Sequence, residues 1–276
     1  MTKVAAIQMA SGPNVQANLL EAARLIQLAA HAGAQLVVLP ENFAIMGMAE
    51  QDKVKISEQQ GSAPLQDFLA EQARKNQLWI VGGTLPLRSK DAQRVRAATL
   101  LFDDKGEQVA RYDKIHLFDV EITENDEHYN ESETIEAGDQ VVVVETPFGK
   151  LGMAVCYDLR FPELFRQMND LGAELFVLPS AFTAITGKAH WETLVRARAI
   201  ENLCYMIASA QGGYHANGRE TFGHSMIVDP WGIVLDKLPR GSGVVTAEID
   251  LQHLRELRRS FPVLGHRRLS CGIVKG

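Results

Sequence analysis

The stretch Leu151-Gly-Met-Ala-Val-Cys-Tyr-Asp-Leu-Arg-Phe-Pro-Glu163 decides how the rest of the chain is interpreted. Its apolar residues 151–155 predict a buried strand, and the residues from Pro162 onward predict a helix with proline in its first turn. Cys156 therefore follows the carboxyl end of a buried strand, where open α/β sheets place their reactive groups. The first amides of the helix can stabilise a thiolate or an oxyanion there. Most cysteines in apolar strands are small buried residues, so Cys156 needs support from other segments.

Outward from this stretch, the same order of elements occurs twice in the chain. Leu171-Gly-Ala-Glu-Leu-Phe-Val-Leu-Pro-Ser-Ala-Phe182 repeats Ala32-Gly-Ala-Gln-Leu-Val-Val-Leu-Pro-Glu-Asn-Phe43. The strand, turn and strand expected around 99–106 match those around 225–232. Two α/β halves on one plan are predicted, and neither the number nor the period of the repeats indicates a solenoid. Because buried strands need helices on their outer faces, two halves stacked sheet against sheet predict four layers, helix–sheet–sheet–helix.

Periodicity and turn residues place the individual elements. Helices are expected over residues 18–31, 64–75, 162–168 and 189–202, and strands over 4–9, 35–39, 78–82, 96–102, 108–114, 151–155 and 203–208. The polar stretch 121–138 does not fit the repeat and is expected to be irregular. A basic amphipathic stretch from Gln252 to Arg268 is expected to form a tail that packs on another surface.

Composition excludes several classes of protein. The chain has 276 residues, of which 46% are hydrophobic and 22% charged, enough for one large domain or two small ones. Its net charge of −6 argues against nucleic acid and anionic membranes as partners. Three cysteines without C-x-x-C spacing argue against a disulfide scaffold and a cysteine-rich zinc site. The first apolar run is too short for a signal peptide and no window approaches a membrane span, so a reducing cytoplasm is the expected location.

The two halves differ where chemistry is expected. Glu41 follows the Leu-Pro strand end of the first half, and Ser180 takes its place in the second. Stacked halves bring these strand ends toward one crevice, so Glu41 and Cys156 form a candidate base and nucleophile. A buried carboxylate with a raised pKa can take a thiol proton, and Lys114, at the end of a hairpin strand, can stabilise an oxyanion. Each also fits a simpler interpretation, Lys114 as a surface lysine and Glu41 as a loop acid.

Histidines offer a different partner for the thiol, since Cys–His pairs are the commoner arrangement. The candidates are His116, His190, His224 and His266. None has the spacing of a known Cys–His family, and His190 is expected at a capping position of a helix. The sequence also lacks an H-E-x-x-H motif and a glycine-rich phosphate loop. The glycine pairs at 82–83 and 212–213 are expected to be turn glycines.

Three segments, in this order, resemble the three signatures of the nitrilase superfamily of carbon–nitrogen hydrolases. They are Leu39-Pro-Glu-Asn-Phe43, Tyr112-Asp-Lys-Ile-His-Leu-Phe-Asp119 and Val155-Cys-Tyr-Asp-Leu-Arg-Phe-Pro-Glu163. The resemblance runs from Val4 to about Arg268. It implies one carbon–nitrogen hydrolase domain over residues 1–276, with a core over about 3–250 and a tail over about 251–276. The implied fold is an α/β, four-layer αββα sandwich of the nitrilase type with two pseudo-symmetric halves.

The resemblance also implies a Glu–Lys–Cys triad. Glu41 takes the role of general base, Lys114 that of oxyanion stabiliser and Cys156 that of nucleophile. The family's second glutamate, near the lysine, is placed on Glu131. Glu127 and Glu133 are the less favoured positions for that second glutamate. This chemistry requires no metal or organic cofactor.

Within the superfamily, the second half resembles the Nit-type branch, the deaminated glutathione amidases. The resembling stretches are Ser180-Ala-Phe-Thr-Ala-Ile-Thr-Gly187, Ala189-His-Trp-Glu192, Arg196-Ala-Arg-Ala-Ile-Glu201 and His224-Ser-Met-Ile-Val-Asp-Pro-Trp-Gly232. The resemblance implies an amidase that hydrolyses deaminated glutathione to 2-oxoglutarate and Cys-Gly. The ω-amidases, which act on 2-oxoglutaramate or 2-oxosuccinamate, share much of this sequence and are the alternative. Outside this chemistry, the sequence is also compatible with a catalytically silent binding or scaffold protein on the same fold and with a Cys–His transferase or protease.

Contacts to the oxyanion and the substrate are expected from residues around the crevice, including the backbone amide of Tyr157. The candidates are Tyr157, Arg160, Phe182, Thr183, His190 and Arg219. Tyr214 and His215 share a loop with Arg219, and all three are candidates to contact the Cys-Gly portion. The expected partner is a small-molecule amide, with no nucleic acid and no membrane. The resemblance also implies a homodimer or larger homo-oligomer, with residues 261–268 packing across subunits.

Overall fold

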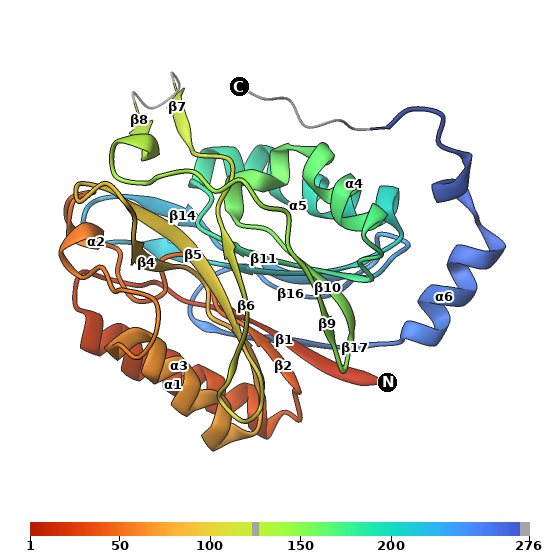
Figure 1. Ribbon diagram of the computed structural model, residues 1–276, viewed down its shortest axis with the longest axis horizontal. Coiled ribbons are helices and arrows are strands. Elements are labelled where there is room, and N and C mark those ends of the chain that lie inside the picture. Colours follow the sequence, from red (N-terminus) through yellow and green to blue (C-terminus); the bar gives the residue numbers. More distant parts are fainter. Residues whose placement is uncertain (123–126, 271–276) are drawn as a thin grey trace.

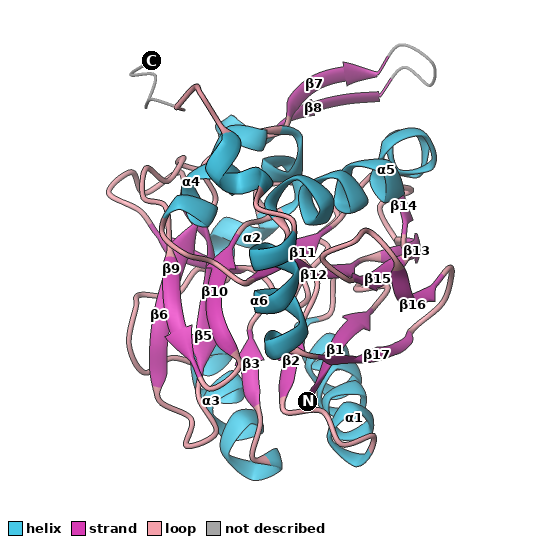
Figure 2. Ribbon diagram, turned by 90° about the vertical axis from the view of Figure 1, so that its right-hand side faces the viewer, coloured by secondary structure: helices cyan, strands magenta, loops and turns pink. Residues whose placement is uncertain are grey.

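The computed structural model of the chain describes residues 1–122 and 127–270. Two β-sheets are stacked face to face, and helices cover the outer face of each (Figure 1). Seen from the side, α1 (Val15–His31) and α3 (Pro64–Asn76) lie below the sheets, and α4 (Pro162–Asp170) and α5 (Ala184–Asn202) lie above them (Figure 2). The predicted four-layer αββα architecture is confirmed.

The first sheet belongs mainly to the first half of the chain and has the order β17-β1-β2-β3-β5-β4, with β6 paired to β5. Its strands are β1 (Thr2–Gln8), β2 (Leu36–Val38), β3 (Trp79–Val81), β4 (Leu85–Arg88), β5 (Val95–Phe102), β6 (Gln108–Asp113) and β17 (Gly243–Ile249). The central strands β1, β2 and β3 are parallel. Side chains alternate between the two faces of β1. Ala5 and Ile7 belong to the cluster packed with α1, whereas Val4 and Ala6 belong to the core shared with the second sheet.

The second sheet repeats this plan with the order β16-β15-β12-β11-β10-β9. Its strands are β9 (Val143–Thr146), β10 (Gly149–Met153), β11 (Leu175–Ser180), β12 (Tyr205–Ala210), β15 (Ser225–Val228) and β16 (Val234–Leu238). Three parallel strands, β10 to β12, are again followed by an antiparallel hairpin. A polar contact adds to the apolar packing between sheets, because the Ser209 hydroxyl of β12 donates to the Ile7 carbonyl of β1. The duplication inferred from the sequence is therefore present in the strand order.

The remaining helices and strands are short and lie outside the two large sheets. They are α2 (Asp52–Lys55), β7 (Asp119–Ile122), β8 (Glu127–Asn130), β13 (Gly212–Tyr214), β14 (Glu220–Phe222), α6 (Leu251–Ser260) and 3₁₀ helices at Glu131–Glu133, Cys156–Arg160 and Val263–His266. Within the described part of 121–138 the expectation of irregular structure is wrong, since β7 and β8 pair as antiparallel strands; residues 123–126 lie outside the described residues. The expected start of α5 at residue 189 is also wrong. Thr183 caps the helix by accepting a hydrogen bond from the Thr186 amide, so His190 lies inside the helix rather than at its cap.

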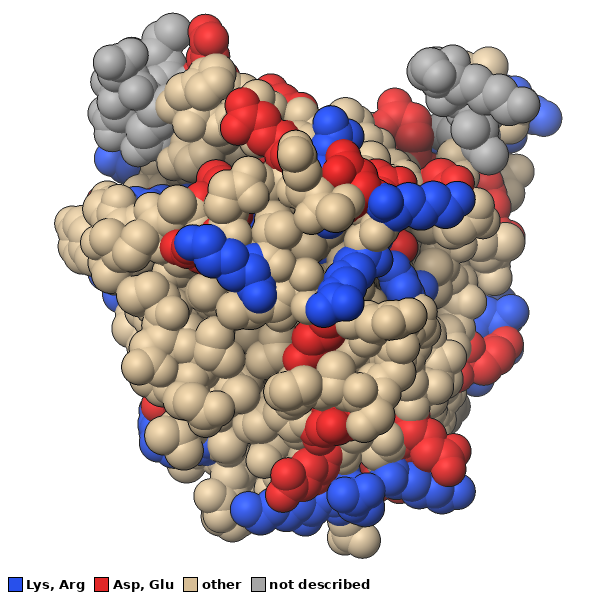
Figure 3. Space-filling model, turned by 60° about the vertical axis from the view of Figure 1, so that its left-hand side comes forward, with Lys and Arg blue, Asp and Glu red and all other residues tan. Residues whose placement is uncertain are grey.

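The charged side chains on one face of the molecule can be followed in Figure 3. Basic and acidic side chains are interspersed on the face in Figure 3 rather than separated into areas of one sign. Among the helices of the described residues, none is both long enough and apolar enough to cross a bilayer.

Gly83, which follows β3, is one position where the fold requires glycine. Its φ of +56° lies in the left-handed region, and a Cβ there would stand 2.2 Å from the Pro40 carbonyl oxygen. The Gly83 carbonyl accepts a hydrogen bond of 2.7 Å from Thr99 Oγ1, which holds the segment from its other side. The chain after β3 can therefore pack directly against the segment that ends in Glu41.

Gly83→Ala is expected to lower the free energy of unfolding by about 3 kcal/mol, through left-handed strain and the collision with Pro40. Gly33→Ala is the matched control, because Gly33 has a φ of +82° and open space around its Cβ position. That control is expected to cost about 1 kcal/mol from backbone strain alone. Urea unfolding of both variants measures the difference. Equal losses would show that the close approach to Pro40 carries no energetic weight.

Candidate active site

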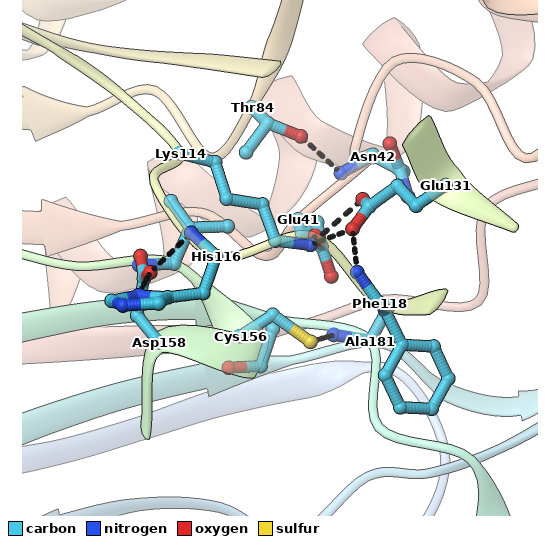
Figure 4. A network of polar contacts seen from close by, with 12 residues as sticks. Glu41, Asn42, Thr84, Lys114, His116, Phe118, Glu131, Cys156, Asp158 and Ala181 are labelled. Atoms are coloured by element: carbon cyan, nitrogen blue, oxygen red, sulfur yellow. Dashed lines mark hydrogen bonds and ion pairs between the residues drawn. The ribbon is translucent and has the colours of Figure 1, made fainter. Parts of the chain in front are cut away.

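The carboxyl ends of the central strands of both sheets border a cavity. Glu41 reaches it three residues after β2, Lys114 directly after β6, and Cys156 after β10. Glu131, in the 3₁₀ helix after β8, completes a group of four ionisable side chains. The structure thus brings together the four residues that the sequence proposed as catalytic, from four separate segments (Figure 4).

Cys156 has an unusual backbone conformation for a cysteine. Its φ is +47°, in the left-handed region that non-glycine residues rarely adopt. Such a conformation costs on the order of 1–3 kcal/mol and persists only where the surroundings enforce it. Here it turns the thiol out of the line of β10 and into the cavity wall, where Sγ accepts a hydrogen bond of 3.5 Å from the Ala181 amide. The side chain is nevertheless only 8% exposed.

Asp158, two residues later, enforces that turn. Its carboxylate is fully buried and accepts hydrogen bonds from the Val155 amide at 2.8 Å and from the Tyr112 hydroxyl at 2.7 Å. The His116 amide donates to the same carboxylate at 3.1 Å, and His116 Nδ1 lies 2.7 Å from it. Tyr112 and His116 flank Lys114, so one buried carboxylate fixes the cysteine turn relative to the lysine segment.

The histidines considered as partners of the thiol have other contacts. His116 is held by Asp158 and stacks on Phe161 with ring centroids 3.7 Å apart. His224 stacks on Phe222, His190 is exposed on α5 and His266 lies in the 3₁₀ helix after α6. Among the described residues that line the cavity, none is a histidine. The Cys–His alternative therefore lacks a structural basis.

Lys114 lies between two carboxylates. Its Nζ is 2.9 Å from Glu41 Oε1 and 2.7 Å from each carboxylate oxygen of Glu131. Glu131 Oε2 also accepts a hydrogen bond of 2.7 Å from the Phe118 amide, which fixes its orientation. The Lys114 side chain is 1% exposed, so these partners replace the water that would otherwise solvate its charge.

Electrostatics set the resting protonation of the site. Burial by itself lowers the pKa of Lys114, but Glu131 and Glu41 outweigh it and raise that pKa well above its usual value. Burial by itself raises the pKa of Glu41, but the Lys114 charge prevails and the pKa is lowered. The expectation of a raised pKa at Glu41 is therefore wrong. Glu41 rests as a carboxylate and can accept a proton.

Cys156 rests as a thiol. Burial, and then the negative charge of Glu41, raise the pKa of Cys156 well above its usual value, and Lys114 opposes this only in part. Figure 4 shows the Glu41 carboxylate, the Lys114 ammonium and the Cys156 sulfur facing one another. The arrangement is a neutral thiol next to a buried base and a buried cation, which permits proton transfer without a free thiolate.

The candidate substrate-binding residues divide into two groups. Tyr157, Phe182, Thr183 and Arg219 line the cavity. Arg160 and His190 do not. The Arg160 guanidinium lies over the rings of Tyr157 and Phe182, 5.7 and 5.3 Å from their centroids, and contacts His190 Nδ1 at 3.3 Å. Both residues therefore contact the residues of the cavity wall rather than the cavity itself, and their proposed part in substrate binding stays a prediction.

Tyr214 and His215 do not line the cavity either. The Tyr214 side chain is 76% exposed. His215 is buried, and its ring nitrogens contact the Ser11 carbonyl at 2.8 Å and Thr221 Oγ1 at 2.7 Å. Of the three candidate residues on this loop, only Arg219 lines the cavity.

Several polar residues that line the cavity were not proposed as site residues from the sequence, and three of them form contacts that shape its rim. These three are Glu50, Lys53 and Asn217, and the others include Asn42, Asn130 and Thr186. Lys53, in α2, forms an ion pair with Glu50, whose side chain is 55% exposed. The Asn217 side chain donates to the Gly47 carbonyl at 2.8 Å, which joins loops of the two halves. No motif or spacing in the sequence connects Glu50, Lys53 or Asn217 to Cys156.

Comparisons with known proteins give consistent results. The sequence profile of the carbon–nitrogen hydrolases matches residues 3–259. A curated Yersinia enterocolitica protein named deaminated glutathione amidase is 42% identical over 272 residues, which cover 98% of this chain and 94% of that protein. The Caenorhabditis elegans NitFhit crystal structure matches with a TM-score of 0.90 and 40% identity, and the match covers 97% of this chain but only 65% of that one. Saccharomyces cerevisiae Nit3, described as a member of branch 10 of the nitrilase superfamily, gives a TM-score of 0.87 and 30% identity over 97% of each chain.

Glu41→Gln is expected to lower the pKa of the Cys156 thiol, because it removes a negative charge and leaves the Lys114 cation. The pH dependence of thiol alkylation measures this pKa. Glu50→Gln is the matched control, since Glu50 lines the same cavity but pairs with Lys53. An unchanged or higher thiol pKa in Glu41→Gln would contradict the charge arrangement described above.

Proposed function

The chain belongs to the carbon–nitrogen hydrolase family, and on that premise we propose that it hydrolyses the amide of deaminated glutathione to 2-oxoglutarate and Cys-Gly. The observation that carries the chemistry is the buried Lys114 held by Glu41 and Glu131 beside the Cys156 thiol. The name of the Yersinia relative, at 42% identity, supports the substrate. The cavity beside Lys114 and Cys156 combines apolar and aromatic side chains with a few polar groups, as small-molecule sites do.

Acylation begins when Glu41 takes the Cys156 proton as the sulfur attacks the amide carbonyl. Negative charge then leaves Glu41 and appears on the carbonyl oxygen. Lys114 is next to Glu41 and to the site of the carbonyl oxygen. Its positive charge is balanced by Glu41 before the proton transfer and stabilises the oxyanion after it. The Tyr157 backbone amide serves as the second oxyanion donor. Losing one such donor typically costs about 10²–10³ in kcat.

The tetrahedral intermediate collapses when protonated Glu41 gives its proton to the leaving nitrogen of Cys-Gly. The product is a thioester between the Cys156 sulfur and the 2-oxoglutaryl group. Water then attacks this thioester, with Glu41 again as the base, and 2-oxoglutarate leaves as the sulfur regains a proton. One carboxylate therefore serves both half-reactions, and a lowered pKa suits it because it must start each of them ionised.

Glu131 acts on Lys114 rather than on the substrate in this proposal. Both of its oxygens contact Nζ at 2.7 Å, so Lys114 keeps a counter-charge even when Glu41 is protonated. Without it, a buried ammonium beside a neutral Glu41 would be costly and could lose its proton. Glu133 instead accepts a hydrogen bond from Asn130, which argues against it as the second glutamate.

A catalytically silent scaffold is the competing function from a different class. Burying the charged groups of Glu41 and Lys114 in one cavity costs stability, because each charge must be removed from water. A binding protein gains nothing from an unpaired thiol beside a base. The intact group therefore favours an enzyme.

We also place the protein in the cytoplasm as a homodimer or larger homo-oligomer. Cys156 and Cys204 are free thiols, which suits a reducing compartment. The rings of Trp231 and Phe261 contact each other 5.5 Å apart, yet their side chains are 55% and 45% exposed. This apolar surface at the start of the tail is consistent with packing against a second copy.

The substrate assignment predicts that kcat/KM for deaminated glutathione exceeds that for 2-oxoglutaramate by more than roughly tenfold, or about 1.4 kcal/mol of transition-state preference. Both substrates deliver the same acyl group and differ only in the leaving amine. The comparison on one enzyme preparation therefore isolates recognition of Cys-Gly. A preference for 2-oxoglutaramate would identify an ω-amidase instead.

Cysteine variants provide the control for that comparison. Cys156→Ala is expected to remove hydrolysis of both substrates, whereas Cys204→Ala is expected to retain most of it. Cys204 is fully buried outside the cavity, and burial raises its pKa to about 12. Substantial turnover by Cys156→Ala would exclude Cys156 as the nucleophile. Cys271, expected to be dispensable, lies outside the described residues.

A further inference from the structure

The cations lining the cavity differ in how their charge is balanced. Lys114 pairs with Glu41 and Glu131, and Lys53 pairs with Glu50. Arg219 lines the same cavity, and no carboxylate among the described residues forms an ion pair with it. Arg219 is therefore the lining cation whose charge the described part of the protein leaves without a direct counter-ion.

Neutral groups hold the Arg219 side chain. Nη2 donates a hydrogen bond of 3.0 Å to the Ala181 carbonyl, and the guanidinium lies over the Tyr129 ring, 4.9 Å from its centroid. Nε is buried and has no hydrogen-bond partner among the described residues. A guanidinium carries five N–H donors in a planar fork that matches a carboxylate. The side chain is thus oriented while part of its donor capacity and its full charge remain available to an anion.

Ala181 places this cation near the nucleophile. Its amide donates to Cys156 Sγ at 3.5 Å while its carbonyl accepts from Arg219 Nη2 at 3.0 Å. The amide nitrogen and the carbonyl oxygen of Ala181 are separated by the width of one residue. Arg219 Nη2 therefore lies within about 10 Å of the Cys156 sulfur. In a 2-oxoglutaryl amide the free carboxylate is four bonds from the scissile carbon, about 5 Å away. A near-attack distance of about 3 Å and a hydrogen bond of about 3 Å complete that span.

We propose that Arg219 binds the free carboxylate of the acyl portion of the substrate and so selects ω-amides of 2-oxo dicarboxylic acids over neutral amides. This assignment rests on the proposed function and adds to it the residue that reads the acyl group. The acyl portion stays attached to Cys156 after the amine has left, so an anchor on it orients both acylation and thioester hydrolysis. Arg219 is hydrogen-bonded to Ala181, whose amide donates to the Cys156 sulfur, so Arg219 is positioned to bind the acyl portion of the substrate.

Three substrates separate the two ends of the ligand. Deaminated glutathione has the acyl carboxylate and the Cys-Gly carboxylate, 2-oxoglutaramate has only the first, and 4-oxopentanamide replaces that carboxylate with a methyl group. The wild type is expected to prefer 2-oxoglutaramate to 4-oxopentanamide by at least roughly tenfold in kcat/KM, the value of a charge-assisted hydrogen bond. Arg219→Gln is expected to raise KM and lower kcat/KM by a similar factor for both carboxylate substrates and to leave 4-oxopentanamide unchanged.

Lys53→Gln is the matched control, because it removes a lining cation that already has a carboxylate partner. It is expected to change kcat/KM for 2-oxoglutaramate less than about threefold, in the range of an exposed ion pair. A loss in Arg219→Gln confined to deaminated glutathione would overturn the proposal, because Arg219 would then read the leaving group. Equal losses for all three substrates would also overturn it, because the effect would then lie at the reacting atoms.

Binding of 2-oxoglutarate to the Cys156→Ala variant, measured by calorimetry, gives a readout that does not require turnover. Adding Arg219→Gln is expected to weaken this binding at least roughly tenfold, and adding Arg219→Lys to weaken it less. Unchanged binding of 2-oxoglutarate in both Arg219 variants would overturn the proposal. If Arg219→Gln does not fold, unchanged binding in Arg219→Lys alone would overturn it. If the wild type hydrolyses amides without preferring the carboxylate, only the role of Arg219 fails. If it hydrolyses none of the three, the proposed function fails.

Discussion

The rest of the structure depends on one constraint, the buried ion pairs that Lys114 forms with Glu41 and Glu131. An ammonium that is 1% exposed is tolerable only if carboxylates replace its water, and here they come from two other segments of the chain. The end of β6, the loop after β2 and the 3₁₀ helix after β8 must therefore converge. The same group keeps Glu41 ionised beside a neutral thiol, so the fold and the chemistry share one electrostatic requirement.

The duplicated architecture supplies this group asymmetrically. Each half ends a central parallel strand with Leu-Pro, but the first half continues with Glu41 and the second with Ser180 and Ala181. Ser180 is fully buried at the end of β11, whereas the Ala181 amide donates to Cys156 and its carbonyl accepts from Arg219. One half thus provides a carboxylate at this strand end and the other provides backbone groups. The two equivalent positions therefore supply a base on one side and a support for the nucleophile and Arg219 on the other.

Much of the fold could be predicted from the sequence, because periodicity, turn residues and the internal repeat are local signals. β17 could not, since its partner β1 lies more than two hundred residues away, with Thr2 opposite Ile249. The convergence of Glu41, Lys114, Glu131 and Cys156 was predicted through the family resemblance. The lowered pKa of Glu41 was not predicted. Burial alone would raise that pKa, and the Lys114 ammonium 2.9 Å away lowers it instead. The position of the Arg160 guanidinium over the rings of Tyr157 and Phe182 could not be predicted either, since the sequence does not show on which side of the cavity wall a side chain lies.

The central claim is that Cys156 forms a thioester with the acyl part of an amide. Glu41 transfers the protons and Lys114 stabilises the oxyanion in this reaction. Rapid acid quenching during turnover, followed by mass analysis of the Cys156 peptide, tests it most directly. Deaminated glutathione and 2-oxoglutaramate should give the same 2-oxoglutaryl adduct on that peptide, because they differ only in the amine that has left. An adduct that retains Cys-Gly, an adduct on another residue, or turnover without any adduct under conditions that preserve thioesters would contradict the account.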